Sequence, residues 1–378
     1  MKKFAEKFIG FSKRVLQGTK ALIAQNRAAS LFLALGLFAL LLRGLGTLWP
    51  FGVERLYSRG VYPLLTKIIS AVSGIFPFGL GQVLVPLLLA LALFWLVRCF
   101  IRGGLKKFLF TAVSLVSLAF FVFIFSWGLN FNRLSLNDAL GWQAGPSSKE
   151  DLRGLTEWLA SEVNKMRPLV MEDENGVATS GWSTKELLQR AGDGYDEISS
   201  LLPWLSVKGS NQKPSLTPRF LSYSGIAGMY LFFSGEGKIN CWQDEPGIAF
   251  SAMHEEAHRR GYSREDEANF LAALAGFSHP DDFFRYSALL ESYVYASNAL
   301  ARVDKEAYKE ISASLCEGAK RDIKNSYDFW KAYEGPVKEI AKKVNDSYLQ
   351  MSGVSDGVRS YGRVVDLLIY VWKNGFLE

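Results

Sequence analysis

The prediction of the fold of this chain starts from the stretch His254-Glu255-Glu256-Ala257-His258. Residues four apart lie on one face of a helix, so the imidazoles of His254 and His258 can converge on one metal ion. Glu255 follows the first histidine, where it can reach a metal-bound water. Two nitrogen ligands, a carboxylate base and a position for water suit a zinc hydrolase. The chain has only 3 histidines, so a chance match is on the order of one in several hundred.

A hydrolytic zinc site needs a third protein ligand, and the segment after the motif offers three acids. A new helix is expected to begin near residue 263. Glu267 shares a helical face with the apolar residues three, four and seven positions later. Glu265 and Asp266 are rotated away and suit the helix N-terminus electrostatically. We therefore expect His254, His258 and Glu267 to bind zinc, with Glu255 as the general base.

Composition points to a membrane rather than to nucleic acid. The chain has 378 residues, of which 49% are hydrophobic and 14% aromatic, and its net charge is +6. The long apolar runs fall in the first third, and basic residues cluster beside them. The sequence carries no RNA- or DNA-binding signature, so we predict no nucleic-acid partner.

Three apolar segments, 28–49, 80–99 and 108–132, each approach the ~20 residues that cross a bilayer as a helix. The first reads as an uncleaved transmembrane helix, because it is long for a signal peptide and no clear cleavage site follows. The part before position 80, with Tyr57, Tyr62, Pro63 and Phe76, is interpreted as an interfacial or re-entrant segment. Residues 1–27 carry seven Lys or Arg and one acid. They either lie on an anionic leaflet as a helix or form a solvated basic tail.

The basic residues also predict the topology. Arg98, at the end of the second segment, and Arg102, Lys106 and Lys107 after it are accompanied by no acid, so the loop between the second and third segments and the N-terminus are expected to be cytoplasmic. The chain then divides into a basic cytoplasmic segment 1–27, a three-helix transmembrane region 28–132 and an extracytoplasmic domain 133–378. The expected partners are the lipid bilayer and a peptide or protein substrate outside the cytoplasm.

The extracytoplasmic part is predicted to be mainly α with a small sheet, an α+β domain of zincin-like type. β-Prone residues and glycines over 219–240 predict one or two strands, and an exposed edge there offers strand addition to a substrate. Helical periodicity predicts helices near 149–166, 183–202, 247–260, 263–277, 281–301, 304–331, 334–350 and 360–374.

Other residues leave alternatives open. His279 precedes Pro280 and is expected to be a surface histidine rather than a ligand. Cys241 and Cys316 either pair in an oxidising compartment or remain free thiols. Four downstream residues are candidates to stabilise an oxyanion, although packing is the favoured role for each: Arg285, Tyr286, Tyr293 and Tyr361.

The sequence resembles an uncharacterised family of bacterial integral membrane proteins, classed as a domain of unknown function. The resemblance lies in H-E-E-A-H-R-R-G-Y-S-R-E-D-E-A-N-F-L (254–271), W-G-L-N-F-N-R (127–133), F-S-G-E (233–236) with Asn240, R-Y-S (285–287), D-S-Y-L (346–349) and S-Y-G-R-V-V-D (360–366). It implies a bacterial cell-membrane protein with a gluzincin-like metallopeptidase domain. It also implies His254, His258 and Glu267 as ligands and Glu255 as base.

These observations predict a membrane-anchored zinc metallopeptidase that hydrolyses peptide bonds by metal-activated water. The motif departs from the usual zincin pattern, because Glu256 and Arg259 are charged where uncharged residues are usual. We expect Glu256 to pair with Arg259 or Arg260 on the outer face of the helix. The alternative is a zincin-like binding or scaffold protein in the membrane, with weak or no turnover.

Overall fold

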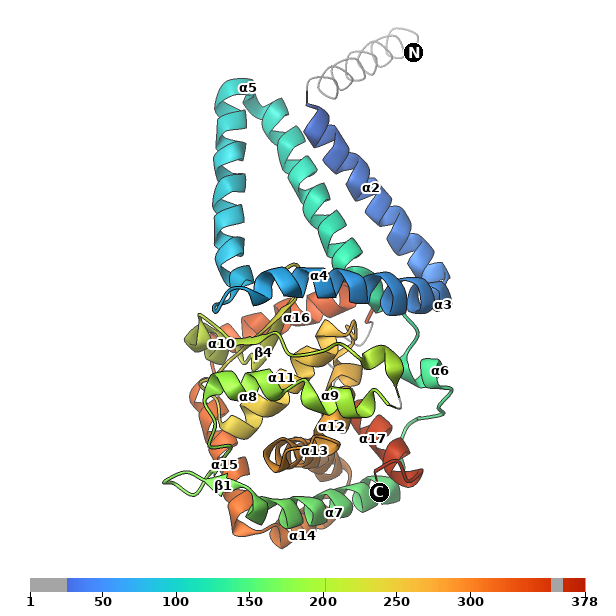
Figure 1. Ribbon diagram of the computed structural model, residues 1–378, viewed down its shortest axis with the longest axis vertical. Helices are drawn as coiled ribbons and strands as arrows, with labels where there is room; N and C mark the ends of the chain where they lie inside the picture. The colour runs from blue at the N-terminus through green and yellow to red at the C-terminus, as the bar shows by residue number, and fades with distance from the viewer. Residues whose placement is uncertain (1–25, 201, 355–362, 378) are drawn as a thin grey trace, which may run out of the picture.

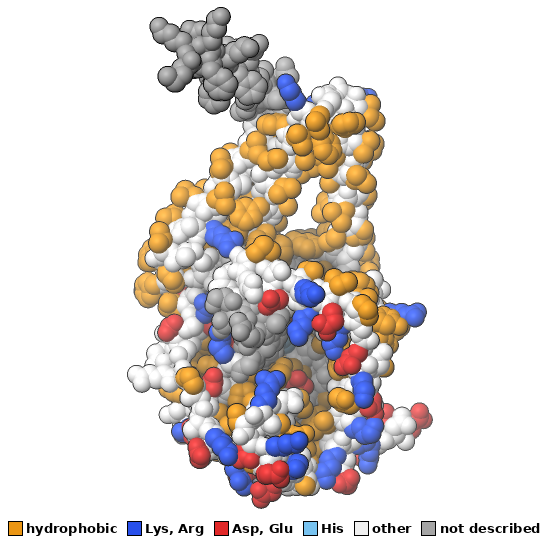
Figure 2. Space-filling view, turned by 180° about the vertical axis from the view of Figure 1, so that it is seen from behind, with side chains coloured by type: hydrophobic (Ala, Val, Ile, Leu, Met, Phe, Trp, Pro, Cys, Tyr) orange, Lys and Arg blue, Asp and Glu red, His pale blue; other side chains and the backbone are white. Residues whose placement is uncertain are grey.

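The molecule has an apolar part and a larger, mostly helical body. The computed structural model describes residues 26–200, 202–354 and 363–377, so all but the last two residues of the predicted segment 1–27 lie outside it. Figure 1 shows long helices projecting from one end of the body, with α4 lying across their feet. Figure 2 shows hydrophobic side chains gathered on the projecting part, and Lys, Arg, Asp and Glu spread over the body.

Two described helices are long and apolar enough to cross a membrane, α2 (Arg27–Leu48) and α5 (Leu80–Ser126). α5 is interrupted at Gly104, whose φ of 64° and ψ of −170° are non-helical and favour glycine. Figure 1 shows its two arms folding back as an inverted V. These arms cover the predicted second and third segments, except that the second arm ends early and a 3-10 turn, η2 (Gly128–Asn132), follows.

α2 packs against α5 through small residues. A Cβ built on Gly36 would lie 2.7 Å from the Cβ of Ser117, so the two helix backbones approach closely there. Close approach through small residues is a common way for apolar helices to associate where water supplies no driving force.

The segment before α5 is a two-faced helix, as an interfacial segment requires. It comprises α3 (Pro50–Gly52), the π-helical η1 (Val53–Val61) and α4 (Tyr62–Gly74). The face toward the body buries Tyr62, Thr66 and Ser73. The opposite face exposes large apolar side chains at helical spacing: Val61, Leu64, Ile68, Val72 and Ile75.

The body is built on two central helices, α11 (Glu245–Arg259) and α12 (Glu265–Phe277), which pack on each other and on α13 (Asp282–Val303). α13 in turn packs on α7 (Lys149–Met166). The remaining described helices are α6 (Leu136–Leu140), η3 (Arg167–Leu169), α8 (Thr184–Arg190), α9 (Asp193–Ile198), η4 (Pro203–Leu205), α10 (Pro218–Ser224), α14 (Lys305–Ser314), α15 (Glu317–Ala332), α16 (Pro336–Met351) and α17 (Val364–Lys373).

Two small sheets complete the body. β1 (Met171–Glu172) and β2 (Ala178–Thr179) form an antiparallel pair. The larger sheet has the order β3-β5-β4, in which β3 (Gln212–Pro214) is parallel and β4 (Gly228–Leu231) antiparallel to β5 (Glu236–Ile239). Gly228 lies opposite Ile239, and Leu231 lies opposite Glu236. β4 is therefore an edge strand of this sheet.

The structure confirms a mainly helical chain with a small sheet and refines several predicted helices. The predicted helix 149–166 has the bounds of α7. The predicted helix 304–331 is broken at Leu315 and Cys316, and 183–202 is divided into α8 and α9. Residues 218–224 form α10, where a strand was predicted. Cys241 and Cys316 are both free thiols.

Buried charges join the apolar part to the body. Arg133, which follows η2, forms a bidentate pair with Glu54 of η1, with N–O distances of 2.8 Å, and donates to the Gly261 carbonyl at 3.0 Å. Glu236 of β5 accepts hydrogen bonds from the amides of Leu80 and Gly81 at the start of α5. The helices that carry the apolar part are thus held in a fixed position on the sheet and on the α11–α12 turn.

Candidate metal centre

The His254–His258 motif lies on α11, as predicted, and the chain reverses directly after it. Asp244 caps the start of the helix by accepting from the Gly247 amide at 2.9 Å. Gly261, with φ of +85°, makes the reversal in a conformation that suits only glycine readily. α12 then begins at Glu265, and this turn brings its first residue beside the two histidines.

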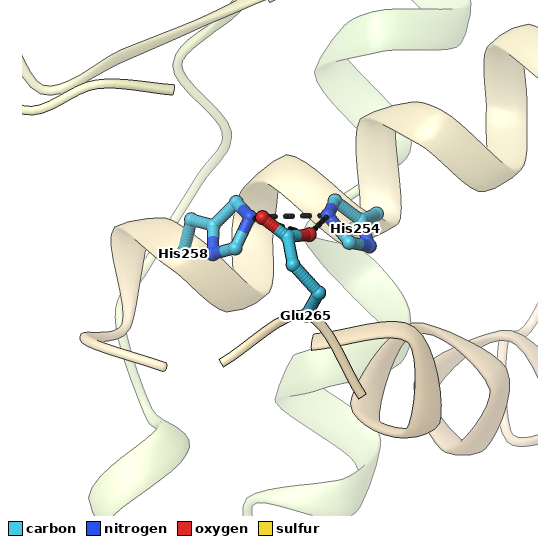
Figure 3. Close-up of side chains that lie close together, drawn as sticks. All are labelled: His254, His258 and Glu265. Atoms are coloured by element: carbon cyan, nitrogen blue, oxygen red, sulfur yellow. Dashed lines mark hydrogen bonds and ion pairs between the residues drawn. The ribbon is translucent and has the colours of Figure 1, made fainter. Parts of the chain in front are cut away.

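Two imidazoles and one carboxylate meet at the turn. His254 Nε2 lies 3.0 Å from His258 Nε2, and Glu265 Oε2 lies 3.1 Å from the first and 3.6 Å from the second. Figure 3 shows the three side chains pointing to one point from α11 and the start of α12. All three ligand atoms lie within 4.8 Å of one another, and among the described residues this is the one group of three or more His, Cys, Asp or Glu so arranged.

The geometry of this triad fits a tetrahedral zinc site. With metal–ligand bonds of about 2.0–2.1 Å, two ligand atoms of a tetrahedron lie about 3.3 Å apart. The observed separations of 3.0, 3.1 and 3.6 Å bracket that value. Two nitrogens and one carboxylate oxygen also match the donor set of catalytic zinc sites, which keep a further position for water. The residues present therefore fit the group that the motif implies.

His258 is held in the orientation that this role needs. Its Nδ1 lies 2.6 Å from the Tyr262 carbonyl oxygen, so Nδ1 carries the proton and Nε2 is directed to the triad. The ring packs against the edge of Trp127, with centroids 5.7 Å apart, and the Tyr62 hydroxyl donates to the His258 carbonyl at 3.2 Å. Burial lowers the pKa of His258, but the Glu265 carboxylate outweighs it and raises the pKa, and a metal ion at Nε2 would take the place of that second proton.

The structure places Glu265 beside the histidines, and not Glu267, which was predicted to join them as the third ligand. Glu267 is buried, as its apolar face predicted, but Oε1 accepts from the Leu136 amide at 2.7 Å and from Arg264 at 3.2 Å. The face of α12 that carries Glu267 packs on the core, whereas Glu265, in the first turn of α12, lies beside the two histidines of α11. Helical side chains tilt toward the N-terminus, so the first residue of α12 reaches back to the motif.

Glu256 and the two arginines after it are buried, so the predicted position on an outer helix face is wrong. Glu256 pairs with Arg259 at 2.9 Å and also with Arg260, and it accepts from Gln212 at 2.8 Å and from the Asn211 amide at 3.2 Å. Burial opposes ionisation, but the two guanidinium groups outweigh it and lower the pKa of Glu256 to about 2. Burial is therefore compatible with these charges, because each has partners.

The Glu255 side chain lies against β4 and β5 of the sheet. A Cβ built on Gly228 of β4 would lie 2.5 Å from its Oε1, and one on Gly237 of β5 would lie 2.8 Å from its Cβ. Its Oε2 is buried and has no hydrogen-bond partner within the described part of the chain. Burial raises the pKa of Glu255, and the imidazoles of His258 and His254 oppose this. The carboxylate of this residue, which follows His254 in the chain, thus has an oxygen free to accept a proton.

The predicted oxyanion candidates that the structure describes are engaged in other contacts. The Tyr286 hydroxyl donates to Asp322, the Tyr293 hydroxyl lies 3.1 Å from Ser312, and Arg285 pairs with Asp282 at 2.9 Å. Tyr361 lies outside the described residues.

His279 is not on the surface as predicted, because it is 1% exposed. Its ring stacks on Phe284 with centroids 4.1 Å apart, and its nitrogens bond the Arg190 carbonyl and the Asp281 amide. It therefore has a structural role in the body.

Sequence reasoning did not find the aromatic residues that surround the triad. Tyr230 of β4 packs near His258, with ring centroids 6.5 Å apart, and its hydroxyl lies 3.3 Å from that of Tyr62. Tyr348 of α16 accepts from the Trp127 indole at 2.9 Å. These residues come from four distant parts of the chain, so no local pattern indicates that they meet.

The fold and the site define a mostly helical protein with helices apolar enough to cross a membrane and a His-His-Glu cluster at the base of its apolar part. The chain matches the family described as "Protein of unknown function (DUF3810)" over residues 57–369 and belongs to that family. The match runs across the predicted domain boundary at residue 133. No curated protein and no protein of solved structure matches the chain.

Proposed function

We propose that this protein is a membrane-anchored zinc metallopeptidase of gluzincin-like type. The observation that carries the proposal is the convergence of His254, His258 and Glu265 at separations of 3.0–3.6 Å beside Glu255, whose Oε2 has no described partner. This arrangement differs from the sequence prediction only in the acid that joins the histidines.

The side chains divide the chemistry of peptide hydrolysis. Bound at the triad, zinc would supply a Lewis acid that polarises a carbonyl and lowers the pKa of water. Glu255 accepts a proton from the attacking water and passes it to the leaving nitrogen. The Tyr262 carbonyl holds the His258 ring, and the Gly228 backbone keeps the Glu255 carboxylate against the sheet.

The membrane arrangement that we propose has three spans, namely α2 and the two arms of α5. Each arm of α5 is long enough to cross a bilayer, and the bend at Gly104 lies among Arg98, Arg102, Lys106 and Lys107. The excess of basic residues favours a cytoplasmic bend and N-terminus. The body and the triad then lie outside the cytoplasm.

Zinc content and turnover test this proposal together. We expect the full-length protein to bind one zinc ion per chain and to cut peptides from a library. E255Q should keep the zinc and lose at least about 100-fold in rate, as general-base loss predicts. E306Q is the matched control, since the Glu306 side chain is 82% exposed. Absence of stoichiometric zinc rejects the proposal, and equal cleavage rates for E255Q and wild type reject Glu255 as the base. Zinc binding without peptide cleavage favours the scaffold alternative.

A further inference from the structure

Strand β4 connects Glu255 to the foot of the apolar helices. At its amino end, a Cβ on Gly228 would lie 2.5 Å from Glu255 Oε1. At its carboxyl end, a Cβ on Gly81 at the start of α5 would lie 2.8 Å from Leu231 Cδ1. The next residue, Phe232, packs edge-on against Phe123 near the end of α5, with centroids 5.5 Å apart. β4 therefore runs from Glu255 to the point where both arms of α5 meet the body.

The outer edge of β4 has no strand partner in the part of the chain that the structure describes. The Asn240 amide donates to the Ala227 carbonyl, and hydrogen-bonded pairs alternate along an antiparallel ladder. Met229 and Leu231 therefore exchange bonds with β5, while Gly228 and Tyr230 direct their N–H and C=O groups away from it. Neither residue's backbone has a further hydrogen-bond partner in the described ranges 26–200, 202–354 and 363–377.

The helix formed by η1 and α4, which lies across the ends of the apolar helices, fixes how far the site lies from the membrane. Its exposed side carries Leu64 and Ile68, which are 63% and 65% exposed. A continuous apolar stripe beside apolar helices is suited to the bilayer interface. Its buried side carries Tyr62, whose hydroxyl donates to the carbonyl of His258. The triad thus lies about one helix diameter, roughly 10 Å, from that interface.

From this geometry we propose that the substrates are membrane-anchored proteins cut just beyond their anchor. A chain leaving the bilayer beside α5 meets the carboxyl end of β4 first and adds to its open edge. Successive residues of the substrate then lie beside Tyr230, Gly228 and finally Glu255. The three residue steps from Leu231 to Gly228 span about 10 Å, so the scissile bond lies about four to eight residues from the end of the anchor.

The direction of β4 also selects the end that carries the anchor. β4 runs from the site toward the membrane, so a strand that pairs antiparallel with it runs from the membrane to the site. Antiparallel pairing is slightly more stable per residue than parallel pairing. The anchor therefore lies on the amino-terminal side of the cut, as in a protein with an N-terminal transmembrane helix or an N-terminal lipid.

The test uses full-length zinc-loaded protein in lipid vesicles and one tail of mixed sequence in four forms. The tail is fused after a transmembrane helix, fused after the same helix with a Gly/Ser insert, fused before the helix, or left free. Cuts that require Glu255 are mapped by mass spectrometry. We expect cuts close to the amino-side anchor, at a new sequence position but the same distance from the helix when the insert is present.

Photocrosslinking of the tail to the E255Q variant measures substrate binding without the need for turnover. A photoreactive group in place of Met229, which is 39% exposed on β4, should crosslink only to tail residues near an amino-side anchor. Cuts or crosslinks that follow sequence regardless of the insert, or that are equal for the free tail, overturn the inference while the proposed function stands. The inference rests on that function, and absence of Glu255-dependent cutting in all four forms would reject both.

Discussion

The choice between Glu265 and Glu267 as the third ligand gives a direct test of the metal centre. In E265Q, a neutral amide replaces the carboxylate whose Oε2 lies 3.1 Å from His254 Nε2 and 3.6 Å from His258 Nε2. Loss of an outer partner of a metal ligand typically costs 10–100-fold in affinity. Loss of a direct ligand should exceed this, so we expect zinc affinity to fall at least about 100-fold, or about 2.7 kcal/mol.

E267Q is the matched control, because the same chemical change is made two residues later on the same helix. Its hydrogen-bond partners are the Leu136 amide and Arg264, so the zinc-binding free energy should change by less than about 0.5 kcal/mol. Competition with a chromophoric zinc chelator measures both affinities, and circular dichroism checks that both variants fold. The assignment is refuted if E267Q loses zinc as E265Q does, or if E265Q keeps wild-type affinity.

Three further predictions follow from buried contacts. In G228A the new Cβ would lie 2.5 Å from Glu255 Oε1, so we expect at least about tenfold slower peptide cleavage with unchanged zinc content. E54Q leaves Arg133 without a charged partner, and thermal unfolding should show a loss of about 3–5 kcal/mol; no loss would show that the pair is dispensable. Burial raises the pKa of Glu291 to about 7. The protonated side chain therefore contributes its full stability to the fold at pH 4.5, and this stability is lost as the pH rises through 7. E291Q should therefore unfold at a higher temperature than wild type at pH 8 but not at pH 4.5, and a pH-independent difference would contradict this.

Buried ionic groups around α11 explain how the helix that carries the two histidines tolerates unusual charges. Glu256 has two guanidinium partners and two hydrogen-bond donors from the β3 region. Arg260 also donates to the Leu205 carbonyl and lies over the Tyr195 ring at 4.1 Å. Removing one member would leave the others buried and unpaired, which costs far more than replacing the whole network. The network therefore fixes the face of α11 that carries Glu256 and Arg260, while Glu255 faces the sheet.

Local patterns predicted much of the fold and part of the site. The apolar runs of α2 and α5, the helical periodicity of α7 and the i, i+4 spacing of His254 and His258 are properties of neighbouring residues. The structure confirms these patterns because each depends only on residues within one helix. The prediction missed the helix break at 191–192 although Gly192 marks it, and it missed the break at 315–316 because neither Gly nor Pro stands there.

The sequence by itself determined the two-histidine helix, with Glu255 between the histidines, and the apolar segments, because short-range spacing fixes which side chains share a helical face. Tertiary structure decided which acid completes the triad, since that depends on where the turn at Gly261 directs the first residue of α12. It also decided that Glu256 is buried among partners and that β4 leads from the apolar helices to the site. These are long-range contacts, and their geometry is set by how α11, α12 and the sheet pack together rather than by the spacing of residues along the chain.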